Sequence, residues 1–387
     1  MKQPVIVSAV RTAIAKQGGT LANIDPSVYG AAVMKEAIKR ACIQSTDIDD
    51  VIFGNCLAGG GNMARLTLLE AGLPLAIPGM TIDRQCGSGI NSIGLAADQI
   101  RAGNGEIFLA GGTESMSRSP YLLAPQSRPY DRMPPQFIKR KLSPNHIGDP
   151  SMGITAENLA EKYEVTRAEQ DLFALESQQK MTNAINSGYF KEQIVPINIT
   201  NRKGESYLFN HDEHVRPSTT IEDLSKLSPA FKKEGSVTAG NSSGVNDGAS
   251  AVVLMPENRA NEEGIEVLAK VKEWAVAGVD PNMMGIGPVP AVQKVLQKAG
   301  LSLEDFDLIE FNEAFAAQVL ACNRELSMNM KKVNVNGGAI AHGHPIAATG
   351  AMLITKLVYE MKRRDAKRAL VAACIGGGQG IALVLER

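Results

Sequence analysis

Two segments of this chain repeat the same order of elements, and this repeat restricts the folds that the sequence can adopt. Residues 51–55 (VIFGN) and 308–312 (LIEFN) are short apolar strands that end in asparagine, and acidic residues precede both. The first asparagine lies 31 residues before Cys86, and the second lies 32 residues before His344. In both cases a helical pattern and an apolar strand ending in glycines follow. The matched spacing favours two copies of one α/β unit over a chance similarity.

The repeat predicts copies at residues 1–118 and 249–387, with a segment of different character at 119–248. Alternating strand and helix patterns within the copies are typical of layered α/β proteins. We expect strands at 4–10, 51–55, 107–110, 308–312 and 369–373, and helices at 26–42, 63–71, 87–103, 155–164 and from 166 to about 188. The last of these helices begins with a capping box, in which Thr166 and Glu169 satisfy each other's backbone N–H groups.

Composition excludes several classes of protein. Among 387 residues, 40 are Lys or Arg and 41 are Asp or Glu, and this balance argues against nucleic acid or an anionic membrane as a partner. No apolar run is long enough to span a bilayer, and the chain enters a strand pattern at once, so we expect no signal peptide. Five scattered cysteines without a C-x-x-C pair predict free thiols in a reducing cytoplasm, and neither disulfides nor a metal site.

Three glycine-flanked positions carry candidate chemistry. Cys86 lies at the start of a helix, where free backbone N–H groups and the helix dipole are expected to stabilise its thiolate. His344 holds the equivalent position in the second copy and is the candidate base for Cys86. Cys374 ends a strand before Gly376-Gly377-Gly378 and is a candidate for moving a second proton. A purely structural role for each cysteine stays open as the alternative.

Three other segments are less specific. Residues 240–244 fit the G-x-S-x-G pattern of serine hydrolases, but a poor strand precedes them. Residues 211–214 (HDEH) lack the helical frame of a metal site, so we expect a solvated turn. Residues 118–148 are basic and proline-rich, which indicates either a solvated insertion or a surface for a phosphorylated ligand or a second subunit. The charged residues counted there are Arg118, Arg128, Arg132, Lys139, Arg140 and Lys141, against Asp131.

Four separated motifs together resemble the thiolase family, the acyl-CoA acetyltransferases. They are DRQCGSG at 83–89, NEAFAAQ at 312–318, GHP at 343–345 and CIGGGQG at 374–380, and the likeness continues in order from residue 4 to residue 386. The resemblance implies α/β architecture, with two βαβαβαββ halves in a five-layer αβαβα sandwich. It also implies a loop domain inserted in the first half. The chain would return from this loop domain to the first half near residue 248.

The resemblance implies an enzyme that interconverts 3-ketoacyl-CoA plus CoA with acyl-CoA plus acetyl-CoA. Cys86 would accept the acyl group, His344 would be its base, and Cys374 would move the α-proton. Asn312, through a water, would form one oxyanion hole beside His344. The backbone N–H groups of Cys86 and Gly376 would form the other oxyanion hole.

Binding residues and partners also follow from the resemblance. Ser243 and Arg216 would hold coenzyme A, and Met284 and Phe315 would line the acyl pocket. Coenzyme A would be a substrate, with no cofactor and no metal. We expect a homodimer or homotetramer in the cytoplasm that acts in fatty acid metabolism, with strands 51–53 and 106–110 continuing the sheet across a two-fold axis.

Several residues depart from the family's usual pattern. They are Asp83, Ser151, His342, Ala347 and Thr349. The serine at 151 argues against strict specificity for acetoacetyl-CoA, and the methyl group of Ala347 is expected to crowd the helix start near His344. Two alternatives stay open: a condensing enzyme similar to ketoacyl synthases, and a non-catalytic relative that binds acyl-CoA. The sequence leaves the preferred acyl chain length and the direction of the reaction undecided.

Overall fold

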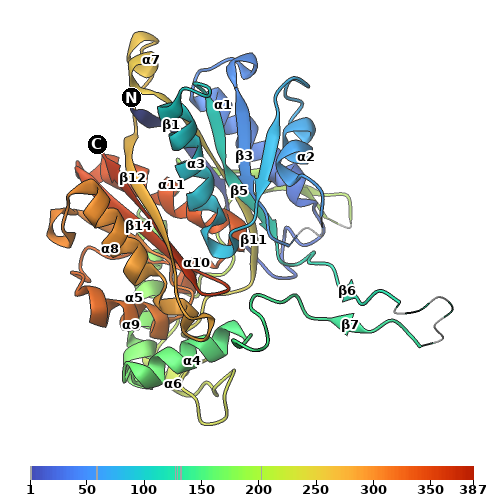
Figure 1. Cartoon of the computed structure of the whole chain (residues 1–387), viewed down its shortest axis with the longest axis vertical. Coiled ribbons are helices and arrows are strands. Elements are labelled where there is room, and N and C mark those ends of the chain that lie inside the picture. Colours follow the sequence, from blue (N-terminus) through green and yellow to red (C-terminus); the bar gives the residue numbers. More distant parts are fainter. Residues whose placement is uncertain (1, 58–59, 127, 129, 131–132, 202) are drawn as a thin grey trace.

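The computed structural model describes residues 2–57, 60–126, 128, 130, 133–201 and 203–387. Asp131 and Arg132 of the basic stretch lie outside the described residues. Figure 1 shows two groups of strands and helices side by side, with a long hairpin that projects from one of them.

The two halves arrange their strands in the same order, counted outward from the centre of the sheet. The first half runs β1 (Pro4–Thr12), β11 (Asn246–Pro256), β5 (Phe108–Ser115), β3 (Asp50–Gly54) and β4 (Gly79–Ile82). The second half runs β12 (Ala269–Gly278), β15 (Gln379–Glu386), β14 (Arg368–Ile375) and β13 (Leu308–Phe311). A single parallel bridge from Ile309 to Val333 occupies the position of β4 in the second half. The predicted duplication is therefore confirmed.

Among the described residues, the two half-sheets pair with each other at their centre through two residue pairs. Val5 pairs with Lys270 and Ile6 pairs with Ala269, which links β1 to β12 in an antiparallel arrangement. Beyond Ile6 the two strands separate. The sheet is therefore formally continuous, but it consists of two half-sheets that share a short central seam.

Helices form three layers around the two half-sheets. The outer face of the first half is covered by α1 (Pro26–Arg40) and α2 (Met63–Glu70), and that of the second half by α8 (Pro288–Ala299) and α9 (Ala316–Leu326). Between the halves lie α3 (Ser88–Ala102) and α11 (Ile346–Arg364), as Figure 1 shows. The backbones of α3 and α11 are in direct contact at Gly89. A Cβ atom at this position would lie only 2.5 Å from the Ala351 nitrogen. The predicted αβαβα sandwich is confirmed.

The expected helix limits follow from local signals. Asp25 accepts a hydrogen bond from the Ser27 backbone N–H and starts α1 at Pro26. Gly103 adopts the left-handed conformation, with φ of 78°, and ends α3 where the sequence predicted. The capping box at Thr166 and Glu169 is present at the start of α5 (Arg167–Asn186).

The segment between the copies contains small elements. They are β6 (Leu122–Leu123), β7 (Phe137–Ile138), α4 (Met152–Lys162), α5, β8 (Ile194–Val195), β9 (Ile197–Thr200), β10 (Ser206–Phe209) and α6 (Ile221–Ser225). The remaining elements of the chain are β2 (Ala15–Lys16), α7 (Glu257–Glu262), α10 (Ala339–His342) and the 3-10 turns η1 (Ser45–Asp47), η2 (Gln85–Gly87), η3 (Pro281–Ile286) and η4 (Leu303–Asp305). Strands β6 and β7 form the projecting hairpin of Figure 1. Arg140 donates a hydrogen bond to the Cys56 carbonyl, which ties the basic stretch to the first half.

Three features of the first half differ from the expectation. The predicted division at residue 249 falls inside β11, which pairs with β1 and β5, so strand pairing keeps residues up to Pro256 with the first half. Strand β5 continues past Gly112 to Ser115, because β11 pairs with it as far as Asp247 and Ser115. The free edge of the first half is β4, whereas the strands expected to meet a partner, β3 and β5, lie inside the sheet.

No helix among the described residues has the length and apolar character needed to cross a membrane.

Candidate active site

Cys86 lies in the 3-10 turn η2 that precedes α3, and this turn packs directly against the second half. A Cβ atom at Gly87 would lie 2.6 Å from the Ile375 side chain, so only glycine allows β14 to come this close. Gln85 adopts a positive φ of 44°, which is a strained conformation for a residue with a side chain. The turn therefore holds Cys86 at the contact between the two halves.

The environment of Cys86 keeps its thiol protonated at neutral pH. Burial raises the pKa of Cys86 to about 11, although the backbone N–H groups of Gly376 and of Cys86 itself act in the opposite direction. The N–H groups at the helix start therefore favour the thiolate, but they lower the pKa by less than burial raises it. Because desolvation outweighs the N–H donors, a base is needed to remove the proton.

His344 is held in one orientation at the start of α11. Its backbone N–H donates to Asn246 Oδ1 at 2.9 Å, and its Nδ1 lies 2.7 Å from Thr349 Oγ1. The Thr349 hydroxyl donates to the Pro345 carbonyl at 2.9 Å, so its oxygen accepts from Nδ1–H. This network leaves Nε2 without a proton. Burial lowers the pKa of His344 to about 4, so the ring is neutral at pH 7 and Nε2 can accept a proton.

Asn312 follows β13 and lies beside the unprotonated nitrogen of His344. The distance from Asn312 Nδ2 to His344 Nε2 is 3.5 Å. Asn312 is fully buried, and its Oδ1 has no hydrogen-bond partner among the described residues. The structure thus brings Asn312 and His344 together, as the resemblance to the family implied, and leaves the Asn312 amide oxygen free to accept a further hydrogen bond. Their role as an oxyanion hole that includes a water stays a prediction.

Cys374 lies near the end of β14, next to Cys86 and an apolar cluster. Burial raises the pKa of the Cys374 thiol, and the neighbouring Cys86 sulfur contributes in the same direction. Met284 and Phe315 pack in the same cluster as Cys374, together with Leu159. An apolar cluster therefore adjoins the buried Cys374 thiol, and such surroundings suit an acyl chain.

The residues expected to hold coenzyme A lie on loops around this centre. Arg216 lines a cavity of about 340 Å³ that Gly240 also borders. The Ser243 backbone N–H donates to the Ala314 carbonyl at 2.9 Å, which fixes the glycine-rich loop against the segment after β13. The binding roles of Arg216 and Ser243 stay predictions.

The competing motifs are occupied by structural contacts. The Ser242 hydroxyl donates to the Thr238 carbonyl at 2.6 Å, and no strand precedes it, so a nucleophile elbow is not formed. Asp212 forms a buried ion pair with Arg11 at 2.8 Å, and Glu213 accepts from the Lys16 backbone N–H. In the part of the chain that the structure describes, no group of three His, Cys, Asp or Glu side chains is placed to hold a metal ion.

Three further residues support the site in roles that the sequence analysis did not assign. Thr349 and Asn246 orient His344, as described above. Glu114, on β5, accepts hydrogen bonds from the backbone N–H groups of Cys56, Leu57 and Ala347 and from the Asn55 side chain. A hydroxyl one helical turn after a histidine was a usable signal for Thr349. The expected crowding of the helix start by the Ala347 methyl group stays a prediction. The backbone of Ala347 contacts the first half, because its N–H donates to Glu114 and its carbonyl lies against Gly112.

Comparisons with known proteins assign the chain to one protein family. Residues 4–258 match the family profile "Thiolase, N-terminal domain", and residues 265–387 match "Thiolase, C-terminal domain". The acetyl-CoA acetyltransferases of Pseudomonas aeruginosa and Escherichia coli are 50% and 49% identical to this chain, with complete coverage of both proteins in each case.

Solved structures agree with this. The crystal structure of the Bacillus anthracis acetyl-CoA acetyltransferase superposes with a TM-score of 0.95 at 46% identity, covering 100% of this chain and 99% of that one. Human mitochondrial 3-ketoacyl-CoA thiolase in complex with CoA superposes with a TM-score of 0.92 at 41% identity, covering 100% and 98%. The relatives favour neither the ketoacyl-synthase alternative nor the non-catalytic one.

Proposed function

The chain belongs to the thiolase family, and from that premise we propose how its own residues carry out the family's reaction. The chain is an acyltransferase that interconverts 3-ketoacyl-CoA plus CoA with acyl-CoA plus acetyl-CoA. We assign the covalent intermediate to Cys86. One observation carries this assignment: the two halves bring Cys86, the Gly376 N–H and the Cys374 thiol to one place.

The first step is transfer of the Cys86 proton to His344. The neutral imidazole has its free electron pair at Nε2, because Thr349 engages Nδ1–H. The thiolate then attacks the keto carbon of a 3-ketoacyl-CoA, and the oxygen of that carbon gains negative charge. Backbone N–H groups and Asn312 are the donors available to stabilise this charge.

Cleavage of the bond between the keto carbon and the α-carbon leaves the acyl group on Cys86 and releases an acetyl-CoA enolate. Cys374 gives its proton to the enolate carbon, which yields acetyl-CoA and a Cys374 thiolate. The incoming CoA thiol returns a proton to Cys374 and attacks the acyl group. The Cys86 thiolate that leaves recovers its proton from His344, so every proton is accounted for.

Substrate positioning uses the surroundings of the two thiols. Met284 and Phe315 pack with Cys374 in an apolar cluster, which suits the acyl chain. Phe315 also makes an edge-to-face contact with Phe231, at a ring separation of 6.0 Å, which limits the space for long chains. Arg216, at the rim of its cavity, would meet the phosphate groups of coenzyme A, and Ser243 would line the path from there to Cys86.

The deciding experiment is a thiolysis assay across 3-ketoacyl-CoA chain lengths, combined with mass spectrometry after incubation with acetyl-CoA. We expect CoA-dependent cleavage and an acetyl group on Cys86. Full turnover without any acyl group on Cys86 would overturn the assignment. The chain-length series also determines acyl preference, which the motifs leave undecided.

We also propose a homodimer formed through β4, the free edge of the first half. Met80 on β4 and Leu69 on the adjacent α2 are exposed, as is Leu75 between them. An unpaired apolar edge strand is a template for pairing with a second copy. Light scattering should give at least twice the monomer mass, and Met80→Lys should lower that mass. A monomer at micromolar concentration would contradict the proposal.

The setting that fits these properties is acyl-CoA metabolism, such as that of fatty acids, in the cytoplasm. All five cysteines are free thiols, which a reducing compartment preserves. Cell fractionation that recovers the protein and its thiolysis activity outside the cytoplasmic fraction would contradict this location.

A further inference from the structure

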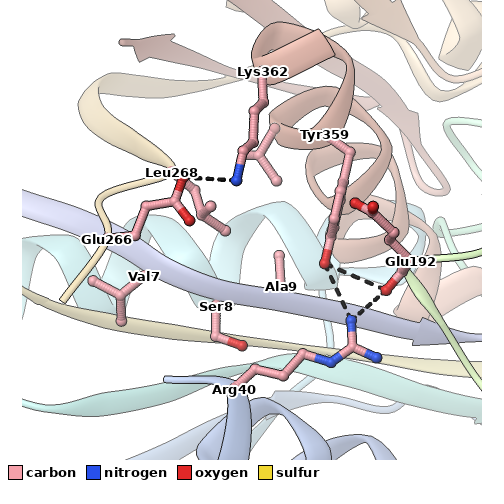
Figure 2. A pocket seen from close by; sticks show the side chains of 10 residues that line it. Val7, Ser8, Ala9, Arg40, Glu192, Glu266, Leu268, Tyr359 and Lys362 are labelled. Carbon is pink, nitrogen blue, oxygen red and sulfur yellow. Dashed lines mark hydrogen bonds and ion pairs between the residues drawn. The ribbon is translucent and has the colours of Figure 1, made fainter. Parts of the chain in front are cut away.

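A second cavity, of about 430 Å³, lies at the seam between the halves (Figure 2). It is distant from His344: Tyr359, which borders it, follows Ile346, the first residue of α11, by 13 residues, which corresponds to about 20 Å at the helical rise. The cavity has a clear structural origin. Strand β1 pairs with β12 only as far as Ile6, and β8 pairs with β1 only from Arg11 onward. Among the described residues, no strand pairs with this edge of β1 in between.

The hydroxyl group of Ser8 is an unsatisfied polar group in this cavity. The backbone register of β1 shifts between Ile6 and Ser8, which places Ser8 on the cavity wall. Ser8 is only 2% exposed, and its Oγ has no hydrogen-bond partner among the described residues. Because buried hydroxyl groups nearly always have a partner, this one indicates a ligand with a polar group at that point.

Charges of both signs border the cavity in equal number. Lys362 and Glu266 form an ion pair at 2.7 Å on one side, and Arg40 contacts the Tyr359 hydroxyl at 3.2 Å on the other, with Ser8 between them in Figure 2. The carboxylate of Glu192 forms no ion pair or hydrogen bond within the described part of the chain. Arg40 also pairs with Glu36, at 2.8 Å. A ligand with a single charge would therefore meet groups of its own sign as well as of the opposite sign, whereas a ligand with both charges can use both sets.

The remaining wall is apolar and small. Val7, Ala9, Leu268 and Val358 supply it. This surface suits a short hydrocarbon body, and the volume lies within the range of small-molecule sites.

We propose that this cavity binds a small zwitterion, namely an α-amino acid with a short apolar side chain. The carboxylate of the ligand accepts from the Ser8 hydroxyl and lies near Lys362 and Arg40. Its ammonium group pairs with the free carboxylate of Glu192, and its side chain covers the apolar wall. The site takes no part in the acyl-transfer reaction and is independent of the roles assigned to Cys86 and His344.

Three probes with the same hydrocarbon body test the charge requirement. L-valine carries both charges, 3-methylbutanoate carries only the carboxylate, and isobutylamine carries only the ammonium group. Calorimetric titration and the melting temperature of the full chain report binding, because a ligand of the native state raises that temperature. We expect valine to bind at millimolar concentration or better, and each single-charge probe to bind at least about tenfold more weakly.

Substitutions then locate the site. Ser8→Ala should weaken valine binding by about three- to tenfold, and Glu192→Gln by about tenfold, while thiolysis stays unchanged in both variants. Ser143→Ala is the matched control, because Ser143 Oγ is also buried without a partner but does not line this cavity. Its affinity for valine should equal that of the wild type.

Two results would overturn the proposal. The first is that neither valine nor alanine binds at tens of millimolar, or that 3-methylbutanoate binds as tightly as valine. The second is that valine affinity is unaffected by both Ser8→Ala and Glu192→Gln, which would place any binding elsewhere.

Discussion

The two halves of the molecule place different side chains at equivalent positions. Both have an asparagine directly after the strand that precedes the helical segment, Asn55 in one and Asn312 in the other. The Asn55 amide donates to the Thr113 carbonyl at 2.8 Å and to Glu114, so it braces the first half. Asn312 instead keeps its Oδ1 without a partner and directs its Nδ2 toward His344. The same fold position is thus structural in one half and available for chemistry in the other.

The difference extends to the neighbouring strand. Gly54 pairs with Gly112 in the first half, and Phe311 pairs with Ala372 in the second, so Gly112 and Ala372 are equivalent positions. Two residues later along these strands, Glu114 is therefore equivalent to Cys374. Glu114 holds four N–H donors, one of them on α11, and thereby joins the halves. Cys374 faces an apolar cluster and Cys86. We infer that duplication supplied two equivalent sets of positions, and that one set provides the frame for the other.

The strongest test of this division is removal of the nucleophile. Cys86→Ala should lower thiolysis and condensation by roughly five orders of magnitude or more, since no other group forms the acyl intermediate. Cys56→Ala is the control, because this cysteine is also buried in the first half but faces Ser88 and Glu114. Mass spectrometry after incubation with acetyl-CoA should find the label on Cys86 alone. A label on Cys374 or Cys56 would reverse the assignment.

The second test separates the two thiols. Cys374→Ser should keep acylation of Cys86 by acetyl-CoA, because that half-reaction breaks no C–H bond. Deuterium exchange at the acetyl methyl should fall by roughly two to four orders of magnitude, since a hydroxyl is a weaker acid than a thiol. His344→Ala should instead slow the acylation itself. If burst acylation falls as far as methyl exchange in Cys374→Ser, Cys374 is a structural part of the glycine turn.

Much of this arrangement was predictable, and the errors have physical causes. The repeat and the spacing to Cys86 and His344 predicted the duplicated architecture, because glycine-flanked helix starts leave a clear local pattern. The extent to which burial raises the pKa of Cys86 was not predictable, since the second half that packs against η2 is distant in sequence. The role of Glu114 was hidden for the same reason, because its donors come from three separate segments.

The third test compares the two asparagines directly. Asn312→Ala should lower kcat by about two to three orders of magnitude, as expected for loss of an oxyanion donor, with little change in KM or in stability. Asn55→Ala should do the reverse, lowering the free energy of unfolding by about 1–3 kcal/mol with a small effect on kcat. Chemical denaturation and steady-state kinetics on both variants decide this. Equal kinetic losses would show that the halves are less specialised than we infer.

The last test concerns the charge of Glu114, whose effect is spread over a range of pH. Burial raises the pKa of Glu114 to about 7 in the folded protein, against 4.5 for the ordinary carboxyl group. The folded state therefore binds the proton more tightly, so this group's contribution to stability is complete below about pH 4.5 and is lost as the pH rises to about 7. Glu114→Gln should flatten this slope, by up to about 3 kcal/mol between the two limits.

The same substitution should also lower stability across the whole pH range. All four groups around Glu114 are N–H donors, so either orientation of a glutamine amide places its NH₂ against another donor. Unfolding in urea between pH 4.5 and 8 measures the slope and the overall level separately. A variant with the wild-type slope would show that Glu114 stays ionised throughout. Its four N–H donors would then outweigh its burial, and the carboxylate would join the two halves at every pH at which the enzyme is folded.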